Sequence, residues 1–347
     1  MRLVLSLAAL VFATPFAAAQ LPPEKAAKSF KVSPGLEFTL WAHEPECVNP
    51  TCMDIDHRGR VWTCESINYR QKLRGEKKMR RPEGDRIMIL EDTKGAGKCD
   101  RATVFYQSPD IHAPLGIAVV PYPDGKGVKV FVCQSPDILV FEDKDDDGKA
   151  DGPPTKLLTG FNGFDHDHGV HGILIGPDNR LYFTVGDTGV RNLQASDGKG
   201  PKFNSNGLDV RAATVWRCDL DGKNLELIAH NFRNNYEPCV DSFGTVFLSD
   251  NDDDGNQQTR ICYVMKGGDY GYHRNPKTSH WNEEHPGIVP KILRTYFGSP
   301  TGICVYEGEL LPKEYQGQLL HVDAGPRHVR CYHLTPKGAS YAVKRED

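Results

Sequence analysis

The sequence predicts an all-β fold, a six-bladed β-propeller, because one turn-and-strand unit recurs along the chain. In each unit, a turn that carries Asp or Gly leads into a strand in which apolar and polar residues alternate. Such units begin at residues 56, 123, 177 and 241, and a weaker one begins at residue 315. A spacing of roughly 50 to 65 residues suits a four-stranded blade with generous loops. A further blade closed by the two chain ends would bring the ring to six.

A second repeat supports the same fold. Asp92, Gly97 and Asp100 recur at a constant offset as Asp143, Gly148 and Asp151, and both sets lie between two strand-like apolar runs. The chain also contains 34 Gly and 24 Pro, which favours many short strands joined by turns. A β-sandwich would not repeat at this interval, so the propeller is the preferred architecture.

The first residues have the three parts of a secretory signal peptide: Arg2, an apolar run over residues 3–12, and an A-x-A exit that ends at Ala19. We therefore expect a signal peptide over 1–19, a polar lead-in over 20–30 and a propeller domain over 31–347. The apolar run is too short to span a bilayer. The expected location is periplasmic or secreted, with no transmembrane segment. The chain ends soon after the fifth unit, which is compatible with its being part of a longer protein.

Composition narrows the classes of partner and of metal site. A formal charge of −4 argues against nucleic-acid binding, which requires a basic stripe. The basic cluster from Arg70 to Arg81 includes Glu76 and is interpreted as a solvated loop. Ten cysteines permit disulfides in an exported chain, but there is no C-x-x-C, which excludes zinc ribbons and thioredoxin chemistry. No C-x-x-C-H haem attachment motif is present either.

One acidic loop has the spacing of a calcium site. Carboxylates at alternate positions followed by Gly148 allow a short loop to curl around a hard cation. The predicted ligands are Asp143, Asp145, Asp147 and Asp151; the alternative is a solvated acidic turn. The repeat copy at Asp92 has Lys94 and Ala96 at ligand positions and is not expected to bind. A third acidic run, 250–255, has similar spacing but lacks a closing carboxylate.

A histidine cluster precedes the third repeat. His166, Asp167, His168 and His171 come just before a predicted strand that ends near Asp187. Neutral imidazole beside a carboxylate is the usual equipment of a general base near neutral pH. Such clusters also bind transition metals, and ordinary polar packing would give the same pattern. The residues alone leave these three interpretations open.

The segment from His168 to Asp187 resembles the motif of the soluble pyrroloquinoline-quinone (PQQ)-dependent glucose and sorbosone dehydrogenases. In that family the His takes a proton from the sugar hydroxyl while hydride passes to the quinone. The resemblance implies His168 as the base, with Asp167 and Asp187 beside it. His171, at a position where the family has a small residue, is the second candidate.

The resemblance continues along the chain. Arg233-Asn234 is similar to the family's R-N-P segment, which holds the quinone carboxylates, although Asn235 replaces the Pro. The turn at Gly267, Gly268 and Tyr270 resembles its G-G-N-Y-G-W segment. Because loops from every blade gather at a propeller's mouth, Glu65 is added to the expected cofactor-binding residues. In the family, a calcium ion beside the quinone uses a Gly-Pro turn, where this chain has Asn251-Asp252.

A second resemblance covers nearly the whole mature chain. Residues 49–70 and the acidic loops are similar to exported propeller "dehydrogenases" of planctomycete-type bacteria, which often continue into a c-type cytochrome. This implies a cytochrome as electron acceptor, on the same full-length chain in some cases. The expected function is thus an exported quinoprotein-like dehydrogenase that oxidises a sugar or related alcohol. Two alternatives are retained: a non-catalytic binding or docking module, and a calcium-dependent hydrolase of the lactonase type.

Overall fold

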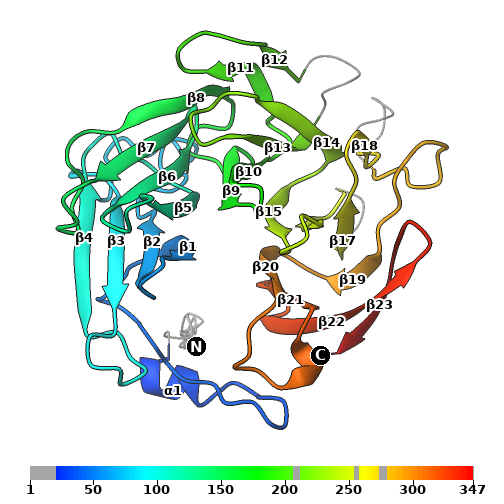
Figure 1. The fold of residues 1–347 in the computed structure, drawn as a ribbon, viewed down its shortest axis with the longest axis horizontal. Helices are drawn as coiled ribbons and strands as arrows, with labels where there is room; N and C mark the ends of the chain where they lie inside the picture. Colours follow the sequence, from blue (N-terminus) through cyan, green and yellow to red (C-terminus); the bar gives the residue numbers. More distant parts are fainter. Residues whose placement is uncertain (1–20, 206–211, 254–257, 273–279, 347) are drawn as a thin grey trace, which may run out of the picture.

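Five sheets, antiparallel apart from one short parallel strand, are arranged in a ring (Figure 1). The computed structural model describes residues 21–205, 212–253, 258–272 and 280–346, so the predicted signal peptide lies outside the described residues. The one α-helix in this part, α1 (Pro23–Ala27), lies within the expected polar lead-in. Among these residues no helix has the length and apolar character needed to cross a bilayer. The predicted all-β propeller is confirmed.

The sheets follow one another in chain order. The first contains β1 (Pro50–Ile55), β2 (Val61–Glu65), β3 (Arg86–Glu91) and β4 (Arg101–Gln107). The second contains β5 (Gly116–Pro121), β6 (Val128–Gln134), β7 (Asp137–Asp143) and β8 (Thr155–Phe161), extended by β11 (Val190–Ala195) and β12 (Phe203–Asn204). The third contains β9 (Val170–Ile175), β10 (Arg180–Val185), β13 (Ala213–Asp219), β14 (Glu226–Phe232) and the short parallel β18 (Gly268–Asp269).

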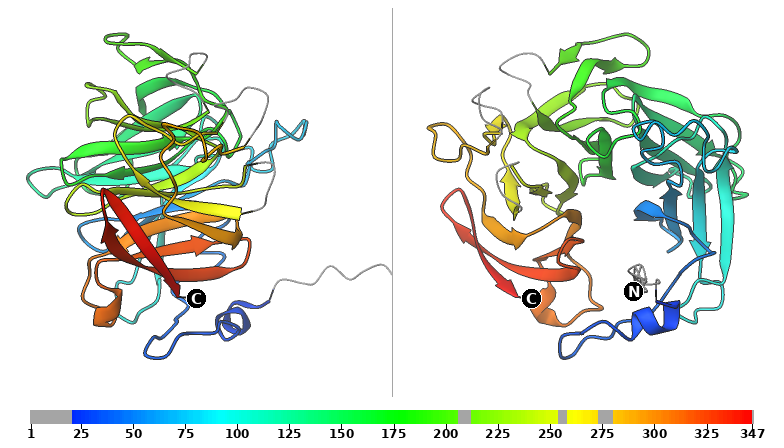
Figure 2. Two further views of the ribbon diagram at one scale, coloured as in Figure 1. Left: turned by 90° about the vertical axis from the view of Figure 1, so that its right-hand side faces the viewer. Right: turned by 180° about the vertical axis from the view of Figure 1, so that it is seen from behind.

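The fourth sheet contains β15 (Asn235–Val240), β16 (Val246–Asp250), β17 (Gln258–Val264) and β19 (Leu293–Phe297). The fifth contains β20 (Pro300–Tyr306), β21 (Gln318–Asp323), β22 (His328–Lys337) and β23 (Ser340–Glu346), with a 3₁₀ turn η1 (Lys313–Tyr315) between its first two strands. The innermost strands contact one another in the order β1, β5, β9, β15 and β20. The first and last sheets flank a sector that residues 21–49 cross at one side of the ring (Figures 1 and 2).

Each predicted repeat unit is the hairpin between the first two strands of one sheet. The turns at residues 56–60, 122–127, 176–179, 241–245 and 307–317 join β1 to β2, β5 to β6, β9 to β10, β15 to β16, and β20 to β21. The two acidic repeats join the third and fourth strands of the first two sheets. Each repeat unit in the sequence therefore corresponds to one sheet, and the described residues form five sheets.

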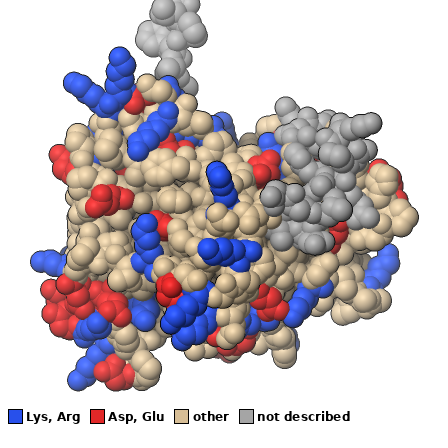
Figure 3. Space-filling model, turned by 90° about the horizontal axis from the view of Figure 1, so that it is seen from above, with Lys and Arg blue, Asp and Glu red and all other residues tan. Residues whose placement is uncertain are grey.

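Neighbouring sheets pack face to face through their apolar residues. Trp62, Ile89 and Phe105 of the first sheet pack against Val130 and Phe141 of the second in one continuous cluster. A larger cluster joins the second and third sheets and includes the fully buried Phe131, Phe183 and Trp216. Burial of these aromatic faces is the main force that holds sheet on sheet. On the side of the molecule seen in Figure 3, Lys and Arg are interspersed with Asp and Glu.

Strand direction divides the loops between two mouths of the ring. One mouth receives the loop that follows each second strand and the loop that precedes each first strand. We call it the histidine mouth, because residues 161–170 and 185–190 lie there. We call the opposite mouth, which receives the hairpin turns and both acidic repeats, the turn mouth. Side chains distant in sequence can meet only if their loops open onto the same mouth.

A buried carboxylate organises the histidine mouth of the first sheet. Glu65, at the end of β2, accepts hydrogen bonds from the Val48 main-chain N–H at 2.7 Å and from both Arg81 and Arg86. Burial alone would raise the pKa of Glu65, but the bonds from Arg86, Arg81 and Val48 outweigh burial and hold this pKa below its ordinary value. Glu65 therefore fixes the chain where it enters β1.

We predict that Glu65→Gln lowers the free energy of unfolding by about 2–4 kcal/mol, because two guanidinium groups lose their buried counter-charge. Since the folded pKa is depressed, the difference from the parent should be full above the ordinary carboxyl range and vanish as the pH falls through the folded pKa. Denaturant unfolding at neutral and acidic pH measures both effects. Glu91→Gln, which breaks the exposed pair with Arg101, is the matched control and should change stability by about 0.5 kcal/mol or less. Equal effects of the two substitutions would contradict the role of Glu65.

Candidate functional site at the histidine mouth

His168 and Asp187 form a direct pair at this mouth. His168 lies in the connection from β8 to β9, and Asp187 follows β10, so the two chain segments run side by side. The Nδ1 atom of His168 is hydrogen-bonded to a carboxylate oxygen of Asp187. Both side chains keep some exposure, 15% and 22%. With Nδ1 engaged by a carboxylate, the neutral ring carries its lone pair on Nε2.

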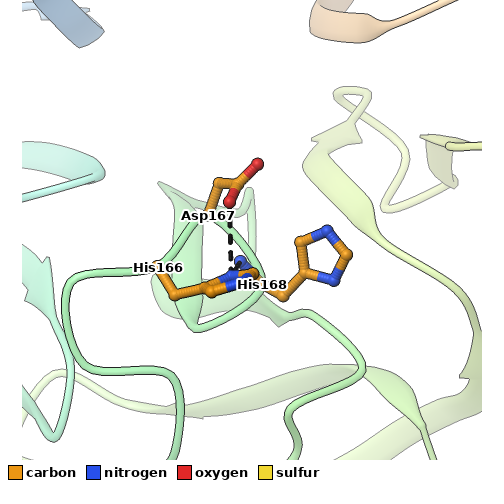
Figure 4. Close-up of side chains that lie close together, drawn as sticks. All are labelled: His166, Asp167 and His168. Carbon is orange, nitrogen blue, oxygen red and sulfur yellow. Dashed lines mark hydrogen bonds and ion pairs between the residues drawn. The ribbon is translucent and has the colours of Figure 1, made fainter. Parts of the chain in front are cut away.

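Asp167 is held by a partner from the first sheet. Its carboxylate forms an ion pair with Arg70, from the loop between β2 and β3, and lies 3.2 Å from Nδ1 of His166. Burial alone would raise the pKa of Asp167, but the Arg70 bond and the nearby charge of His168 hold that pKa below its ordinary value. Ligand-type atoms of His166, Asp167 and His168 lie within 4.8 Å of one another, a group that could hold a metal ion (Figure 4).

His171, the second candidate base, is fully buried beneath this surface. Its Nδ1 lies 2.9 Å from the Thr184 hydroxyl, its Nε2 lies 3.1 Å from Oδ1 of Asn234, and its ring stacks on Tyr236. Burial lowers the pKa of His171 to about 4, so the ring is neutral. Both ring nitrogens are already engaged. The expectation that His171 acts as a base is therefore corrected. The buried His171 ring instead holds the Asn234 side chain in position.

Close packing at Gly186 ties these groups together. A Cβ at this position would lie 2.6 Å from Oδ1 of Asn234 and 2.6 Å from Cα of His168. No side chain fits there, so the backbone before Asp187 contacts both segments directly. His168, Asp187, His171 and Asn234 thus belong to one cluster, although they come from three separate loops and strands.

Asp187 lies two residues beyond the end of β10, and its contact differs from the one that ends the second strand in the other described sheets. In those sheets, the polar side chain that ends the second strand accepts a main-chain N–H at the entry to the first strand. The pairs are Glu65 with Val48, Gln134 with His112, Asp250 with Arg233 and Asn234, and Asp323 with Ser299. Asp187 instead pairs with an imidazole. In the third sheet β10 ends in Val185, which has no polar side chain for this contact, and the pair of Asp187 with His168 lies just beyond it.

Arg233 lies beside this cluster, in the connection from β14 to β15. Its guanidinium is 3.3 Å from Asp252, and its main-chain N–H donates to Asp250 at 3.0 Å. Asp250 is fully buried and also binds Arg260, so the third acidic run begins with a carboxylate that is already paired. Asp254 and Gly255 of that run lie outside the described residues. Arg233 and Asn234 lie in the loop between β14 and β15, which opens onto the histidine mouth.

Other residues expected to bind a cofactor belong to the framework. The Tyr270 hydroxyl donates to the Tyr263 carbonyl at 2.5 Å, and its ring, fully buried, stacks on Phe232. Gly267 and Gly268 form a turn at the turn mouth that joins β18 to β14. Glu65 has no exposed surface and both of its oxygens are occupied. These four expectations are corrected, since none of the groups is open to a ligand at the histidine mouth.

The acidic repeats lie at the turn mouth, away from this cluster. Ligand oxygens of Asp143, Asp145 and Asp151 come within 4.8 Å of one another, and burial raises the pKa of Asp143. Asp147 lies outside this group and accepts a bond from the Lys149 main-chain N–H. In the repeat copy, the ammonium of Lys94 lies 3.1 Å from Asp100, which places a cation of the chain itself against the closing carboxylate.

Sequence reasoning missed Arg70, which it placed in a solvated loop. That loop also bonds to the segment before His168, because the Lys72 main-chain N–H donates to Asp165 at 2.7 Å. A pair of adjacent residues, Tyr69 and Arg70, thus brings an aromatic ring and a cation from the first sheet to the third. The basic composition of the loop was the available signal, but its partner could not be read from a segment so distant in sequence.

Comparison with known proteins places these features in context. Residues 22–347 match the family described as "Domain of unknown function (DUF7133)". No curated protein matches the chain. Among solved structures, the PQQ-bound aldose sugar dehydrogenase of Streptomyces coelicolor is similar, with 17% identity, a TM-score of 0.56, and coverage of 86% of this chain and 80% of that chain.

Two further structures agree with this. A putative oxidoreductase (glucose dehydrogenase) of Thermus thermophilus has 15% identity and a TM-score of 0.58, over 86% of this chain and 84% of that chain. The pyranose dehydrogenase PQQ domain of Coprinopsis cinerea has 13% identity and a TM-score of 0.55, over 86% and 78%. At such identities the similarity establishes the fold, and it confirms the resemblance inferred from sequence. The chain therefore belongs to the DUF7133 family and has the propeller fold seen in sugar dehydrogenases that use PQQ.

Proposed function

We propose that this protein is a quinone-dependent dehydrogenase that oxidises a hydroxyl group of a sugar or related alcohol at the histidine mouth. The observation that carries the proposal is the pair of His168 with Asp187, a partly exposed imidazole next to Asp167 and its ion-pair partner Arg70. Substrate oxidation of this kind requires a proton acceptor and an electron acceptor. The pair supplies the first, and the second must be a bound cofactor.

The donor set at this mouth fits an anionic quinone. PQQ carries carboxylates, and guanidinium groups bind carboxylates well because they offer parallel donors. Nε of Arg70 is buried without a hydrogen-bond partner, so a donor at this mouth remains unsatisfied. Arg70 and Arg233 would hold the cofactor's carboxylates, and Asn234 is kept in place by His171. When bound, the quinone would accept the two electrons of the oxidation.

The chain's own residues account for the proton. Asp187 fixes the His168 ring and favours the tautomer with the proton on Nδ1, which leaves the lone pair of Nε2 as the base. As Nε2 takes a hydroxyl proton from the substrate, the imidazole becomes cationic, and the adjacent carboxylates of Asp187 and Asp167 stabilise that charge. The ion pair with Arg70 keeps Asp167 ionised for this purpose.

We further propose that the protein acts after export, in the periplasm or outside the cell, and passes its electrons to a c-type cytochrome or another external acceptor. The signal-peptide pattern of residues 1–19 and the resemblance to propeller–cytochrome chains support this part of the proposal.

The cluster of His166, Asp167 and His168 favours a second candidate, metal-assisted hydrolysis of a lactone. The test is direct. The purified protein is incubated with PQQ and calcium, offered aldoses and an artificial electron acceptor, and in parallel offered lactones with a transition metal and no quinone. Turnover only in the second assay would show that the protein is a hydrolase and not a dehydrogenase. Inactivity in both, without quinone binding, would leave a binding or docking module.

We predict that His168→Gln lowers turnover by about 10²–10⁴-fold, the usual cost of losing a general base, and leaves quinone affinity within about twofold. Dehydrogenase kinetics and a quinone titration measure the two quantities. The exposed His285, in the loop before β19, provides the control, and His285→Gln should retain turnover. His171→Gln should mainly lower the melting midpoint, because its buried bonds to Thr184 and Asn234 are lost. Full activity of His168→Gln would overturn the assignment.

We predict the reverse pattern for Arg233→Ala. Loss of a guanidinium that binds a carboxylate should weaken quinone affinity by at least about tenfold, while turnover at saturating quinone stays close to that of the parent. The exposed Arg191 on β11 provides the control, since Arg191→Ala should change neither quantity. An unchanged quinone affinity in Arg233→Ala would show that the cofactor is anchored elsewhere.

We also propose calcium binding by Asp143, Asp145 and Asp151. This loop contacts the first sheet, through Asp146 with Arg58 and through the Ala150 main-chain N–H with the Phe105 carbonyl, so an ion here would brace two sheets. Because a ligand of the native state alone raises stability, calcium should raise the melting midpoint and a chelator should lower it. Asp145→Ala should abolish the response and Asp147→Ala should keep it. Equal midpoints with calcium and chelator would refute the site.

A further inference from the structure

The loop that joins β2 to β3 carries an excess of positive charge. We call residues 70–81 the basic loop, which contains seven Lys and Arg residues and one acidic residue, Glu76. Three of the basic residues have acidic partners: Arg70 binds Asp167, Arg80 binds Glu76, and Arg81 binds Glu65. The other four are exposed, and no acidic residue in the described part of the chain forms an ion pair with them; they are Lys72, Arg74, Lys77 and Lys78. Four unpaired cations thus lie within seven consecutive positions.

Buried contacts hold the basic loop in place. Asn68 has no exposed surface and exchanges two hydrogen bonds of 3.0 Å with the main chain of Arg81, so the two ends of the loop are joined. Inside the loop, Nε2 of the buried Gln71 donates to the Glu76 carbonyl at 2.6 Å. Like charges at this spacing repel one another, and a free loop would relieve the repulsion by spreading. The fold instead keeps the cations together, which indicates an anionic ligand.

The basic loop lies against the segment that carries the proposed base. The Lys72 main-chain N–H donates to Asp165 at 2.7 Å, and His168 follows in the same segment. The Lys72 ammonium lies 4.5 Å from the ring centroid of Phe164, also in this segment. Phe164 is 42% exposed, and its ring stacks on the buried His112. Figure 2 shows the connection from β2 to β3 projecting beyond the sheets on one side of the ring. The cations therefore border an exposed aromatic ring close to the histidine cluster.

Cations beside an exposed aromatic ring suit one class of ligand in particular. The C–H face of a sugar ring packs against an aromatic side chain, and Lys and Arg bind carboxylate or sulfate groups. Lys77 and Lys78 lie beyond Lys72 along the loop, so a ligand that meets all three must be longer than the unit that reacts at His168. An acidic polypeptide would also bind the cations, but the exposed Phe164 beside them favours a saccharide.

We propose that the basic loop and Phe164 form a subsite for an acidic saccharide, an oligosaccharide whose units carry carboxylate or sulfate groups. This inference rests on the proposed function for the reaction that the subsite serves. One unit of the saccharide enters the site at His168, and a neighbouring unit packs against Phe164. Its acidic groups bind Lys72 and the other three unpaired cations. The substrates of the dehydrogenase are then acidic oligosaccharides.

Titration without quinone tests the subsite. The purified protein receives, in separate arms, an oligogalacturonate, a sulfated oligosaccharide and a neutral galacto-oligosaccharide, all of one length. The better acidic saccharide should bind at least about tenfold more tightly than the neutral one at low salt, and this advantage should shrink as salt screens the exposed charges. The order of the two acidic arms shows whether the loop prefers carboxylate or sulfate. Equal affinity for acidic and neutral saccharides would overturn the proposal, and so would poly-glutamate bound as tightly as the better acidic saccharide.

Matched variants separate charge from stacking. Lys77→Glu combined with Lys78→Glu should weaken the binding of acidic saccharides by about tenfold or more and leave the neutral one unchanged, because only exposed charges are reversed. Lys199→Glu combined with Lys202→Glu makes the same change in the exposed loop between β11 and β12 and should alter neither. Phe164→Ala should weaken the binding of all the saccharides by about threefold or more. Unchanged affinity in the first or the third of these variants would refute the subsite.

The proposed function is tested apart from the subsite. Oxidation assays with the same saccharides and PQQ report on the dehydrogenase, whereas the titrations need neither quinone nor turnover. An acidic saccharide that binds through these residues and is not oxidised would contradict the dehydrogenase and leave the subsite standing. Oxidation of neutral aldoses with no preference for acidic chains would support the dehydrogenase and contradict the assignment of its substrates.

Discussion

The interaction on which the histidine mouth depends is the bond between the end of each second strand and the entry to the first strand of the same sheet. At the mouth the ladder ends, and the buried main-chain amides there still require acceptors. Glu65, Gln134, Asp250 and Asp323 provide them. Arginines balance the charge of three of these groups, since Arg86, Arg260 and Arg330 bind Glu65, Asp250 and Asp323. The mouth is thus built from the same contact repeated around the ring.

The candidate site arises where this contact changes. In the third sheet, Asp187 pairs with the His168 imidazole, and the loop that carries His168 is fixed by other means. Its anchors come from the first sheet: Lys72 N–H bonds to Asp165, and Arg70 pairs with Asp167. β10 ends in an apolar residue, Val185, and the carboxylate just beyond it orients an imidazole. The location of the proposed chemistry therefore follows from the architecture of the repeat.

Much of this architecture could be predicted from the sequence, because turn residues recur at the same place in every hairpin. The acidic loops were also placed correctly between two strands. What the sequence could not supply was the direction of individual side chains. His171 lies three residues from His168 yet is fully buried, and Tyr270 belongs to a recognisable turn but is fully buried in the framework. In both cases the motif located the segment but did not show whether the side chain points into the core or toward the mouth.

Contacts between distant loops escaped prediction for a related reason. Arg70 belongs to a basic stretch whose composition suggests a solvated loop, and its partner Asp167 lies in the connection between the second and third sheets. Only the curved arrangement of consecutive sheets brings these loops to one mouth. Glu65 illustrates the converse, since an acidic residue near the mouth was expected to meet a cofactor, whereas the fold uses it to hold Val48, Arg81 and Arg86.

The most direct test of the account compares Asp187→Asn with Asp250→Asn, because both carboxylates lie where a second strand reaches the histidine mouth and only Asp187 contacts an imidazole. Turnover and unfolding free energy are measured for both variants. If Asp187 orients and stabilises a catalytic imidazole, Asp187→Asn should lose about 10²–10⁴-fold in turnover with little change in stability, and Asp250→Asn should lose stability. If Asp187→Asn instead unfolds as readily as Asp250→Asn and the folded fraction turns over normally, Asp187 is a structural residue and the central claim is wrong.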